Sequence, residues 1–465
     1  MVYRDGRAEQ VKIAYIGGGS RGWGWGLMSD LASCGGMSGD VYLYDIDFSA
    51  AQHNEVIGNL YRNAEGARSV WNYHAVRSAG EALTGADFVV ISILPGNFDD
   101  MESDVHAPEK YGIYQSVGDT TGPGGIVRAM RTLPMYEEIA ANIRRYCPEA
   151  WVISYTNPMS LCVKTLYRVF PEIRAFGCCH EVFGTQKALA EALLKCRGAE
   201  AERHEIKVNP VGVNHFTWLT HARYRDLDLF PVWREFAERY AATGYTENLD
   251  KNWMNNSFSC SNRVKFDLFL RYGVIAAAGD RHLAEFCEGG WYLRNPETVR
   301  KWGFGLTTVK WRKEDLAKRL AKSEGYRNGS ISVAIKNTGE EGVEQMRAIL
   351  GLRELVTNVN LPNVGQIPNL PLGAVVETNA VFRSGSVTPV FAGDVPKAIY
   401  PLVARVSGQQ EALSDAIARR NGKDVFNVFL NDPLTTCSYD DARLLFREMV
   451  ANTASYLSSY DLTGI

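Results

Sequence analysis

The sequence predicts an α/β protein with a doubly wound parallel sheet, and three observations lead to that prediction. Short apolar runs of strand length recur through the first third of the chain. Stretches with helical periodicity separate these runs, as the crossover connections between parallel strands require. A glycine-rich turn directly follows the first run, where a strand would give way to a helix.

The expected strands and helices of the first half alternate along the chain. The apolar residues of the strands are consecutive, which is typical of strands that are covered on both faces. The helix from Trp23 to about Ser33 should pack back on the first strand. The strands are expected at residues 11–16, 41–45, 87–93, 151–158 and 173–178, and further helices at 48–64 and 134–146.

The second half of the chain, from about residue 200, has a different pattern. Residues 204–224 alternate between apolar and polar side chains, as antiparallel strands do, and the turn-rich segment 371–390 predicts a hairpin. We therefore expect an N-terminal α/β domain over residues 1–200 and a C-terminal α+β domain over residues 201–465. Helices of the second half are expected at residues 231–242, 261–273, 309–323, 397–420 and 440–457.

The composition is that of an ordinary globular protein with nearly balanced charge. Hydrophobic residues make up 46% and charged residues 22% of the 465, and 50 Lys+Arg against 53 Asp+Glu give a net charge of −3. That balance offers no basic surface for a phosphate backbone, so we expect no nucleic-acid partner. The first ten residues lack an apolar segment, no apolar run is long enough to span a membrane, and the nine cysteines show no disulfide spacing. We therefore expect a cytoplasmic protein.

The glycine-rich turn has the spacing of a dinucleotide-binding fingerprint. Gly17, Gly19 and Gly22 form the pattern G-x-G-x-x-G between a strand and a helix. The first permits a tight turn, the second lets the backbone approach a pyrophosphate at the helix N-terminus, and the third brings helix and strand close. Asp45 ends the next strand, where its carboxylate would bind the ribose hydroxyls of NAD and disfavour the 2′-phosphate of NADP.

The N-terminal domain is therefore expected to be Rossmann-like and to bind NAD. The alternative interpretation is a glycine-rich turn without a ligand. The expected cofactor-binding residues are Gly17, Gly18, Gly19, Ser20, Gly22 and Asp45.

Four further motifs carry polar residues that should meet near this turn, because loops at the carboxyl ends of the strands converge above the cofactor. A thiolate and an imidazole from different elements can hold a divalent ion and leave positions open for substrate oxygens, which makes Cys179 and His215 candidate ligands. The alternative is a buried free cysteine and a hydrogen-bonded histidine, and spacing alone favours that alternative. The four motifs are GDTTGPGG (118–125), YTNP (155–158), CCHE (178–181) and VNHF (213–216).

Together these motifs resemble those of glycoside hydrolase family 4. The resemblance extends in order over roughly residues 10–290, and the C-terminal helices and hairpin fit the same family. It implies a glycosidase that uses NAD and a divalent metal ion, commonly Mn²⁺, and whose C-terminal domain carries substrate, metal and subunit contacts. The shared motifs are GGGS (17–20), GDTTGPGG, TNP (156–158), CHE (179–181), NHF (214–216) and GDRHLAEF (279–286).

The resemblance also implies a role for each polar residue. Cys179 and His215 would bind the metal, and Asn157 and Asp119 would contact the substrate. His180 would protonate the leaving oxygen. Members that cleave sugar phosphates carry Asp at this position, so the Cys-His pair is similar to members that act on unphosphorylated α-glycosides. The longer motif CHEV resembles the branch of α-galacturonidases and α-galactosidases, and the α-galacturonidases most closely.

The catalytic base is where the chain departs from the family. Several relatives use a tyrosine in the segment that corresponds to residues 279–286, and this segment contains none here. The resemblance therefore leaves Asp280 or His282 as the base. Tyr272 and a metal-bound hydroxide are the remaining alternatives.

The implied reaction is an oxidation at C3 of the sugar, removal of the C2 proton, elimination of the aglycone, addition of water and re-reduction. A uronate would need an arginine for its carboxylate, and Arg128, Arg263 and Arg281 are candidates. The sequence leaves open whether the sugar is galacturonate, glucuronate or galactose, and which metal is native. We expect a small carbohydrate substrate, no membrane partner and a homodimer or homotetramer.

Two other functions fit part of the sequence. A dehydrogenase of the lactate and malate type shares the N-terminal architecture but has no use for the cysteine of CCHE. An NAD-sensing regulatory protein would be expected to carry a basic recognition helix, which the sequence lacks. Release of sugar without accumulation of NADH would separate the glycosidase from both.

Overall fold

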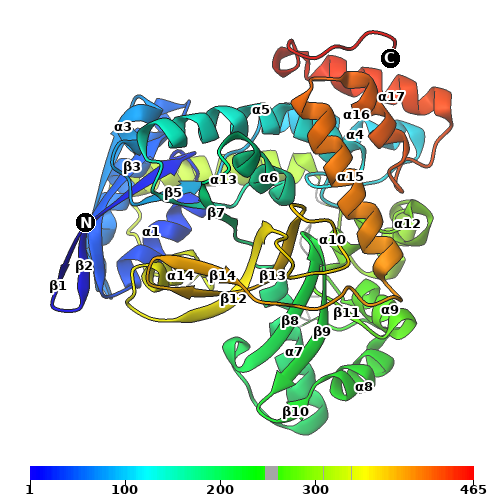
Figure 1. Ribbon diagram of the computed structural model, residues 1–465, viewed down its shortest axis with the longest axis horizontal. Coiled ribbons are helices and arrows are strands. Elements are labelled where there is room, and N and C mark those ends of the chain that lie inside the picture. The colour runs from blue at the N-terminus through cyan, green and yellow to red at the C-terminus, as the bar shows by residue number, and fades with distance from the viewer. Residues whose placement is uncertain (247–259, 307, 337) are drawn as a thin grey trace.

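One large sheet organises the computed structural model, which describes residues 1–246, 260–306, 308–336 and 338–465 (Figure 1). Its strands lie in the order β14-β13-β12-β7-β6-β5-β2-β3-β4, and β1 pairs with β2. The strands of this sheet are β1 Val2–Arg4, β2 Arg7–Ile16, β3 Met37–Tyr44, β4 Trp71–Val76, β5 Phe88–Ile91, β6 Trp151–Ser154, β7 Arg174–Gly177, β12 Leu355–Pro362, β13 Val375–Arg383 and β14 Ser386–Pro389.

Six neighbouring strands, β4-β3-β2-β5-β6-β7, are all parallel. Numbered along the chain, their order is 3-2-1-4-5-6, the arrangement of a dinucleotide-binding fold, with its crevice where the order reverses between β2 and β5. Alternate side chains of the central strands enter two cores. Ala14 and Ile16 pack with α5 and α6, whereas Ile13 and Tyr15 pack with α1 and α14. The predicted α/β class with a doubly wound parallel sheet is therefore confirmed.

Seventeen α-helices surround the sheets in the described part of the chain, and none of them is long and apolar enough to cross a bilayer. They are α1 Trp23–Ser33, α2 Phe48–Leu60, α3 Ala79–Leu83, α4 Phe98–His106, α5 Gly122–Tyr146, α6 Met159–Val169, α7 Glu181–Arg197, α8 Phe230–Tyr240, α9 Arg263–Tyr272, α10 Asp280–Glu285, α11 Gly289–Tyr292, α12 Pro296–Trp302, α13 Val309–Arg327, α14 Gly342–Ile349, α15 Tyr400–Ala418, α16 Gly422–Leu430 and α17 Tyr439–Asn452.

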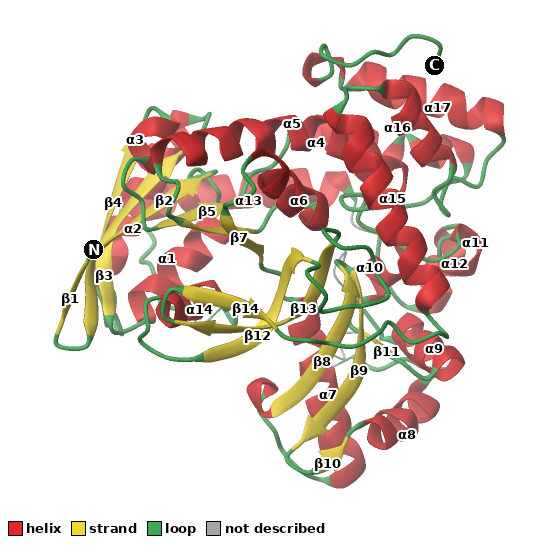
Figure 2. Ribbon diagram, in the orientation of Figure 1, coloured by secondary structure: helices red, strands yellow, loops and turns green. Residues whose placement is uncertain are grey.

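A second, smaller sheet forms the lower lobe of Figure 2. It consists of β8 Ile206–Val213, β9 Phe216–Tyr224, β10 Leu227–Asp228 and β11 Ile275–Ala276, all paired antiparallel to β9. This confirms the antiparallel strands predicted over residues 204–224. The helices α7, α8 and α9 pack on this sheet around the buried side chains of Trp233, Phe236 and Phe266.

The large sheet is not confined to residues 1–200. Strand β12 pairs antiparallel to β7 through Asn360 and Gly177, and β13 and β14 continue the sheet as the predicted hairpin. Strand β12 was not predicted, because its sequence LVTNVNLP mixes asparagines into an apolar run. The second half of the chain thus reaches the carboxyl ends of the parallel strands.

Helix α5 begins earlier than predicted. The prediction placed the helix at residues 134–146. Instead Pro123 occupies the first turn, Pro134 lies inside the helix, and residues 122–125 of the expected loop are helical. Proline 134 cannot donate to the carbonyl oxygen of Met130, and the Tyr460 hydroxyl donates to that oxygen at 2.7 Å in its place.

Candidate active site

The turn between β2 and α1 leaves no room for side chains. Gly17 adopts a φ of +91°, and a Cβ there would lie 2.1 Å from the carbonyl oxygen of Ser92. A Cβ on Gly18 would lie 2.7 Å from the Cβ of Leu43. Helix α1 begins shortly afterwards at Trp23; its N-cap residue, Gly22, has no side chain to cap it, and among the described residues only the Ser20 hydroxyl lies within reach of a first-turn amide, 3.4 Å from that of Gly24. A helix end with uncapped amide groups can receive a phosphate.

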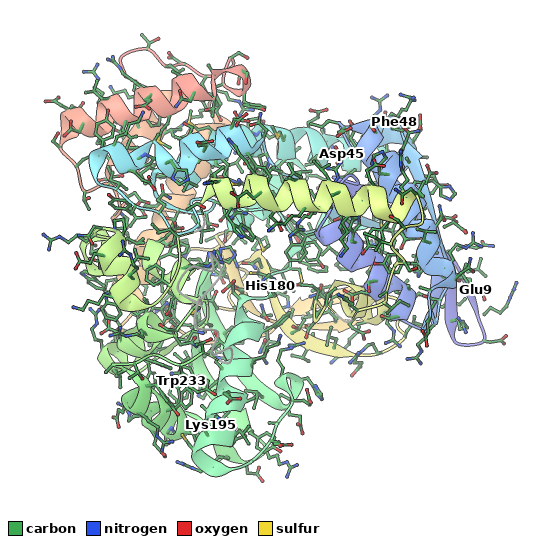
Figure 3. All side chains as sticks on the ribbon, turned by 180° about the vertical axis from the view of Figure 1, so that it is seen from behind. Glu9, Asp45, Phe48, His180, Lys195 and Trp233 are labelled. Atoms are coloured by element: carbon green, nitrogen blue, oxygen red, sulfur yellow. The ribbon has the colours of Figure 1, made fainter. Side chains whose placement is uncertain are left out.

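Asp45 lies beside this turn, at the end of β3 (Figure 3). Its carboxylate accepts a hydrogen bond from the backbone amide of Gly19 at 2.8 Å and another from that of Asp47 at 2.9 Å. Burial raises the pKa of Asp45, and these two amide donors oppose the rise. Each oxygen keeps a second lone pair, so the carboxylate can still accept hydroxyl groups.

Gly22 has a different neighbour from the one that the fingerprint predicts. A Cβ at this position would lie 2.3 Å from Nη1 of Arg319 in α13, and no strand atom is nearby. Arg319 donates to the carbonyl oxygen of Arg21 at 3.2 Å. The expected role of Gly22 in bringing helix and strand together is therefore not seen: Gly22 makes room for Arg319 of α13, whereas Gly18 brings the turn itself close to Leu43 of β3.

Asp119 and Asn157, the expected substrate contacts, lie together. The side-chain amide of Asn157 donates to Asp119 at 3.2 Å, and its Oδ1 is buried without a partner among the described residues. Burial by itself would raise the pKa of Asp119, but Arg128, His282 and His215 hold it well below the usual range. An ionised carboxylate and an unpaired amide oxygen therefore share this part of the site.

His215 and His282 stack on each other, with ring centroids 4.1 Å apart. The Thr120 hydroxyl lies 3.3 Å from Nδ1 of His215. Burial and the neighbouring His282 lower the pKa of His215 to about 3, and burial lowers the pKa of His282 as well. Both imidazoles are therefore neutral near pH 7, and each keeps a nitrogen lone pair for an ion or a proton.

Glu181 joins the histidines, although sequence reasoning had not singled it out. Its carboxylate lies 3.5 Å from Nε2 of His282 and 4.0 Å from Nε2 of His180, and it accepts the backbone amide of Gly279 at 2.7 Å. Burial opposes ionisation, but His282, His180 and His215 lower the pKa of Glu181 to about 2. A negative charge thus lies among three imidazoles.

His180 occupies the N-terminal end of α7, and half of its side chain is exposed (Figure 3). Its Nδ1 lies 3.0 Å from the Glu340 carboxylate, and this hydrogen bond raises the pKa of His180 against the opposing effect of burial. The ring packs on Trp23, whose indole packs in turn on Tyr155. An imidazole whose protonated form is favoured and which still reaches solvent is suited to donate a proton.

The two adjacent cysteines face different surroundings. Cys178 packs in the core that lies under α1 and α14. Cys179 lies beside the side chain of Asn214, the residue before His215, and this side chain partly opposes the effect of burial on the thiol pKa. Burial raises the pKa of Cys179 well above its usual value, and Glu377 adds to the rise. Only the second thiol therefore faces the β8–β9 turn that carries His215.

The donor set of Cys179 and His215 fits a catalytic ion better than a structural one. Both residues interact electrostatically with Glu181, so they belong to one cluster. Within the described ranges, no three His, Cys, Asp or Glu side chains are grouped to enclose an ion by themselves. A thiolate and a neutral imidazole would leave positions open for substrate, and loss of the thiol proton would accompany metal binding.

Asp280 faces away from this cluster. It is fully buried at the start of α10 and accepts the backbone amide of Lys265 in α9 at 3.1 Å. Burial raises the pKa of Asp280 to about 6, and Lys265 opposes the rise. Two residues along α10, His282 points to His215, because neighbouring helical positions face different sides. Tyr272 packs edge-on against Trp218.

Three arginines interact with Asp119: Arg128, Arg281 and Arg312. Nη1 of Arg128 and Nε of Arg312 are buried and have no partner in the described part of the chain. The third arginine considered from the sequence, Arg263, lies elsewhere, donates to two backbone carbonyls and covers a tryptophan ring. The site is thus bordered by cations on the side of Asp119.

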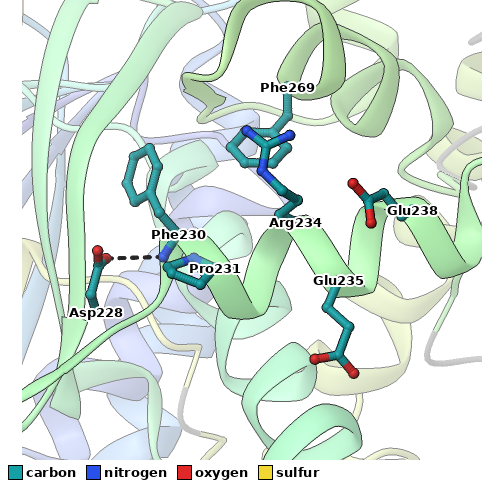
Figure 4. Close-up of a pocket in the computed structure, with 7 residues that line it drawn as sticks. All are labelled: Asp228, Phe230, Pro231, Arg234, Glu235, Glu238 and Phe269. Carbon is teal, nitrogen blue, oxygen red and sulfur yellow. Dashed lines mark hydrogen bonds between the residues drawn. The ribbon is translucent and has the colours of Figure 1, made fainter.

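A cavity of about 340 Å³ extends the site from the N-terminus of α1 towards His180. Gly22, Trp23, Tyr155 and Glu340 contribute to its walls. A separate surface pocket of about 370 Å³ lies between α8 and α9 in the lower lobe (Figure 4). Its walls contain none of the expected site residues, so the cavity beside α1 is the one that belongs to the site.

Sequence reasoning missed Glu181, Glu340 and Arg312. Glu181 directly follows His180 within the CHE motif, so the motif itself held the signal. Glu340 and Arg312 are far from the other site residues along the chain and belong to no motif. Their positions depend on how α13 and the segment before α14 fold back over the parallel sheet.

Two family models match the chain, namely "Family 4 glycosyl hydrolase" over residues 12–195 and "Family 4 glycosyl hydrolase C-terminal domain" over residues 210–435. An α-galacturonidase from Thermoanaerobacterium saccharolyticum is 58% identical over 463 residues, which are 99% of this chain and 100% of that relative. A solved structure described as the glucosidase LplD of Bacillus subtilis is 53% identical, with a TM-score of 0.90 over 95% of this chain and 100% of that one. A 6-phospho-β-glucosidase from Thermotoga maritima, solved with manganese, NAD⁺ and glucose-6-phosphate, shares the fold at 20% identity, with a TM-score of 0.74 over 96% of this chain and 99% of that one.

Proposed function

This chain belongs to family 4 of the glycosyl hydrolases and is a glycosidase, and we propose that it cleaves α-galacturonides with NAD and a divalent metal ion as cofactors. A net dehydrogenase and an NAD-sensing protein are not favoured, because a relative that is 58% identical over its whole length is a glycosidase. One observation carries the proposal: polar residues from both halves of the chain form a continuous series of contacts. The series is Asn157, Asp119, Thr120, His215, His282, Glu181 and His180.

The turn after β2 supports a dinucleotide at the N-terminus of α1. Side chains are excluded at Gly17, Gly18 and Gly19, so a pyrophosphate could approach the backbone of this turn and the first turn of α1 closely. Asp45 would accept the ribose hydroxyls and would repel an additional phosphate, which favours NAD over NADP. Ser20 and Gly22 complete the turn before the first residue of α1.

Cys179 and His215 are the residues that would hold the metal ion. When bound, the nicotinamide supplies reversible hydride transfer at C3 of the sugar, and a divalent ion such as Mn²⁺ supplies polarisation of the oxygens at C2 and C3. Asn157 and Asp119 would orient the sugar hydroxyls, because the one offers an unpaired buried oxygen and the other an ionised carboxylate.

His180 would donate the proton to the leaving oxygen, and His282 would remove the proton from C2. The hydrogen bond with Glu340 favours the protonated form of His180, as an acid requires. His282 is neutral, its Nδ1 has no partner in the residues the structure describes, and Glu181 would stabilise the imidazolium that forms. Asp280 is the weaker candidate for the base, since its contacts are with α9.

The substrate carboxylate would pair with the arginines beside Asp119. Arg128 and Arg312 each carry a buried nitrogen that lacks a partner in the described ranges. The carboxylate of a uronate would accept hydrogen bonds from these two nitrogens. A neutral galactoside would leave them unpaired in a dry site, which costs about 1–3 kcal/mol for each such group. The cationic border therefore supports an acidic sugar over a neutral one.

A panel of substrates tests this proposal. The chain would be incubated with catalytic NAD⁺ and Mn²⁺ and with 4-nitrophenyl α-galacturonide, α-glucuronide or α-galactoside. We expect the fastest release from the galacturonide, a requirement for both cofactors, and no accumulation of NADH. Faster cleavage of the galactoside would contradict the substrate assignment, and steady accumulation of NADH would indicate a dehydrogenase.

We further propose that the enzyme is cytoplasmic and forms a homodimer or homotetramer. All nine cysteines are free thiols, which suits a reducing compartment. The division into an NAD-binding domain over residues 1–200 and a second domain over residues 201–465 also stays a proposal, with β12, β13 and β14 as the part of the second that joins the sheet of the first.

A further inference from the structure

Glu377 is a buried carboxylate that the reaction above does not use. It is the third residue of β13 and is 1% exposed, and among the described residues the side chains that contact it are neutral donors. A carboxylate in such a place is costly unless several donors bind it. Four side chains do so: Asn358 at 2.8 Å, Thr217 at 2.5 Å, Asn360 at 3.4 Å and Asn214 at 3.5 Å.

Two of these donors lead directly to the metal-binding pair. Asn214 is the residue before His215 in the β8–β9 turn, and its side chain lies close enough to the Cys179 thiol to influence the pKa of that thiol. Asn358 donates to the backbone carbonyl of Cys179 at 3.3 Å as well as to Glu377. Glu377 is therefore linked to the backbone of both proposed ligands through a single intervening residue, Asn358 for Cys179 and Asn214 for His215.

This arrangement links side chains from three segments of the chain at the proposed metal site. Cys179 follows β7, His215 lies between β8 and β9, and Glu377 reaches both from β13. The relative position of a thiol and an imidazole on separate segments depends on what holds the segments in register. Partners behind metal ligands orient them and are needed for full affinity.

We propose that Glu377 is the positioning residue of the metal site: it fixes Asn214 and Asn358, and these fix His215 and Cys179. The proposal rests on the assignment of Cys179 and His215 as metal ligands. It predicts that Glu377 changes the affinity for the metal ion, although its carboxylate contacts neither the substrate nor the ion.

The strongest test replaces the carboxylate by an amide of the same shape. In Glu377→Gln, one oxygen that accepts hydrogen bonds becomes an amino group, which then faces two donors: either Asn358 and Asn360 at one oxygen or Thr217 and Asn214 at the other. Mn²⁺ binding to the metal-free full-length protein would be measured by electron paramagnetic resonance, and Co²⁺ binding by the thiolate-to-cobalt charge-transfer absorbance. We expect affinities lower by about 10–100-fold, the usual range for a lost partner behind a ligand.

A milder variant removes a single donor to Glu377, and a matched control variant changes a threonine of β13. Thr217→Val removes only the hydroxyl that donates to Glu377. Thr378→Val makes the same chemical change at a buried threonine next to Glu377, whose side chain faces the other side of β13 and whose hydroxyl has no partner in the described part of the chain. We expect several-fold weaker metal binding for Thr217→Val and unchanged binding for Thr378→Val.

Each outcome decides between the proposals. Circular dichroism would first show that each variant is folded, and the milder pair decides the question if Glu377→Gln does not fold. Wild-type metal affinity in folded Glu377→Gln, or equal affinities in Thr217→Val and Thr378→Val, would overturn the role of Glu377 and leave the ligands untouched. Undiminished binding in Cys179→Ser would overturn the ligand assignment, and the role of Glu377 with it.

Discussion

Arg312 is one of the three arginines that interact with Asp119, and its guanidinium group would pair with the carboxylate of a uronate substrate. It stands in the first turn of α13, whose start is tied to α4 by a hydrogen bond from the Val309 amide to His106 at 3.2 Å. We predict that Arg312→Met lowers kcat/KM for 4-nitrophenyl α-galacturonide by roughly 10–100-fold, the scale of one lost charge-assisted hydrogen bond. The α-galactoside should change little. Arg263→Met is the matched control and should alter neither substrate, since Arg263 lies outside the site; equal losses on both sugars in Arg312→Met would refute a carboxylate contact.

His180 is assigned as the general acid. Its contribution to the rate depends on how strongly departure of the leaving group requires protonation. An alkoxide is a poor leaving group, whereas 4-nitrophenolate departs without much protonation. We therefore predict that His180→Gln lowers kcat for methyl α-galacturonide by about 10²–10⁴-fold, the usual contribution of general acid catalysis. The loss on the 4-nitrophenyl substrate should be much smaller. Steady-state rates on the two substrates are the measurement, and the same loss on both would exclude the acid role.

Glu285 provides a prediction about pH. It is buried in α10 and accepts the backbone amides of Val117 and Gly118 at 2.8 and 2.9 Å, next to Asp119. Burial raises the pKa of Glu285 to about 8 from a usual value of 4.5. The folded state therefore binds this proton more tightly than the unfolded state does, so its contribution is present at low pH and is lost as the pH rises from about 4.5 to about 8.

Glutamine at this position cannot titrate. As the pH rises from about 4.5 to about 8, wild type should lose stability that Glu285→Gln does not lose. The free energy of unfolding of the variant minus that of wild type should therefore increase by on the order of 1–3 kcal/mol. Urea titrations at several pH values would measure it. Parallel pH dependences of the two proteins would show that Glu285 is ionised throughout.

At the scale of elements, α5 shows how a distant residue supports a helix that its own sequence would interrupt. The Tyr460 hydroxyl donates a hydrogen bond to the carbonyl oxygen of Met130, to which Pro134 cannot donate. We predict that Tyr460→Phe lowers the free energy of unfolding by about 1–3 kcal/mol, because a buried carbonyl loses its partner. In a Pro134→Ala background the new amide serves the same carbonyl, so Tyr460→Phe should cost less there. Equal costs in the two backgrounds, measured by urea unfolding, would contradict this account.

The same helix marks the limit of prediction from the sequence. The parallel strands and α1 could be predicted, because continuous apolar runs and a glycine turn are local signals. The start of α5 could not, since the partner that tolerates Pro134 is far along the chain. Strand β12 was missed for a related reason: Asn358 and Asn360 look unlike a buried strand until Glu377 accepts their side-chain amides.

The candidate site likewise has features that the sequence predicts and features that only the fold determines. Cys179, His180, His215 and His282 stand in short motifs that the sequence displays, and the structure brings them to one cluster with Glu181. Whether Asp280 or His282 faces that cluster depends on the rotation of α10, which the motif does not encode.

At the scale of the whole molecule, neither half of the chain carries the reaction alone. The first half supplies the turn for the dinucleotide, and the second supplies His215, His282 and the strands that continue the sheet. The two ionised carboxylates of the described site, Asp119 and Glu181, contact an asparagine amide and imidazoles. We assign neither of them the acid or nucleophile role that conventional hydrolysis gives to paired carboxylates, and propose instead a reversible oxidation that activates the C2 proton before the aglycone leaves.

Solvent exchange at C2 of the sugar tests that central claim most directly. Hydrolysis of 4-nitrophenyl α-galacturonide would be run in D₂O with catalytic NAD⁺ and Mn²⁺, and the released sugar examined by nuclear magnetic resonance. Because the proton taken from C2 by His282 exchanges with solvent before the reverse step, we predict deuterium at C2 of the product. Direct displacement at C1 never disturbs the C2 hydrogen. A product that carries only hydrogen at C2 would contradict elimination, and the role of His282 as the base would fall with it.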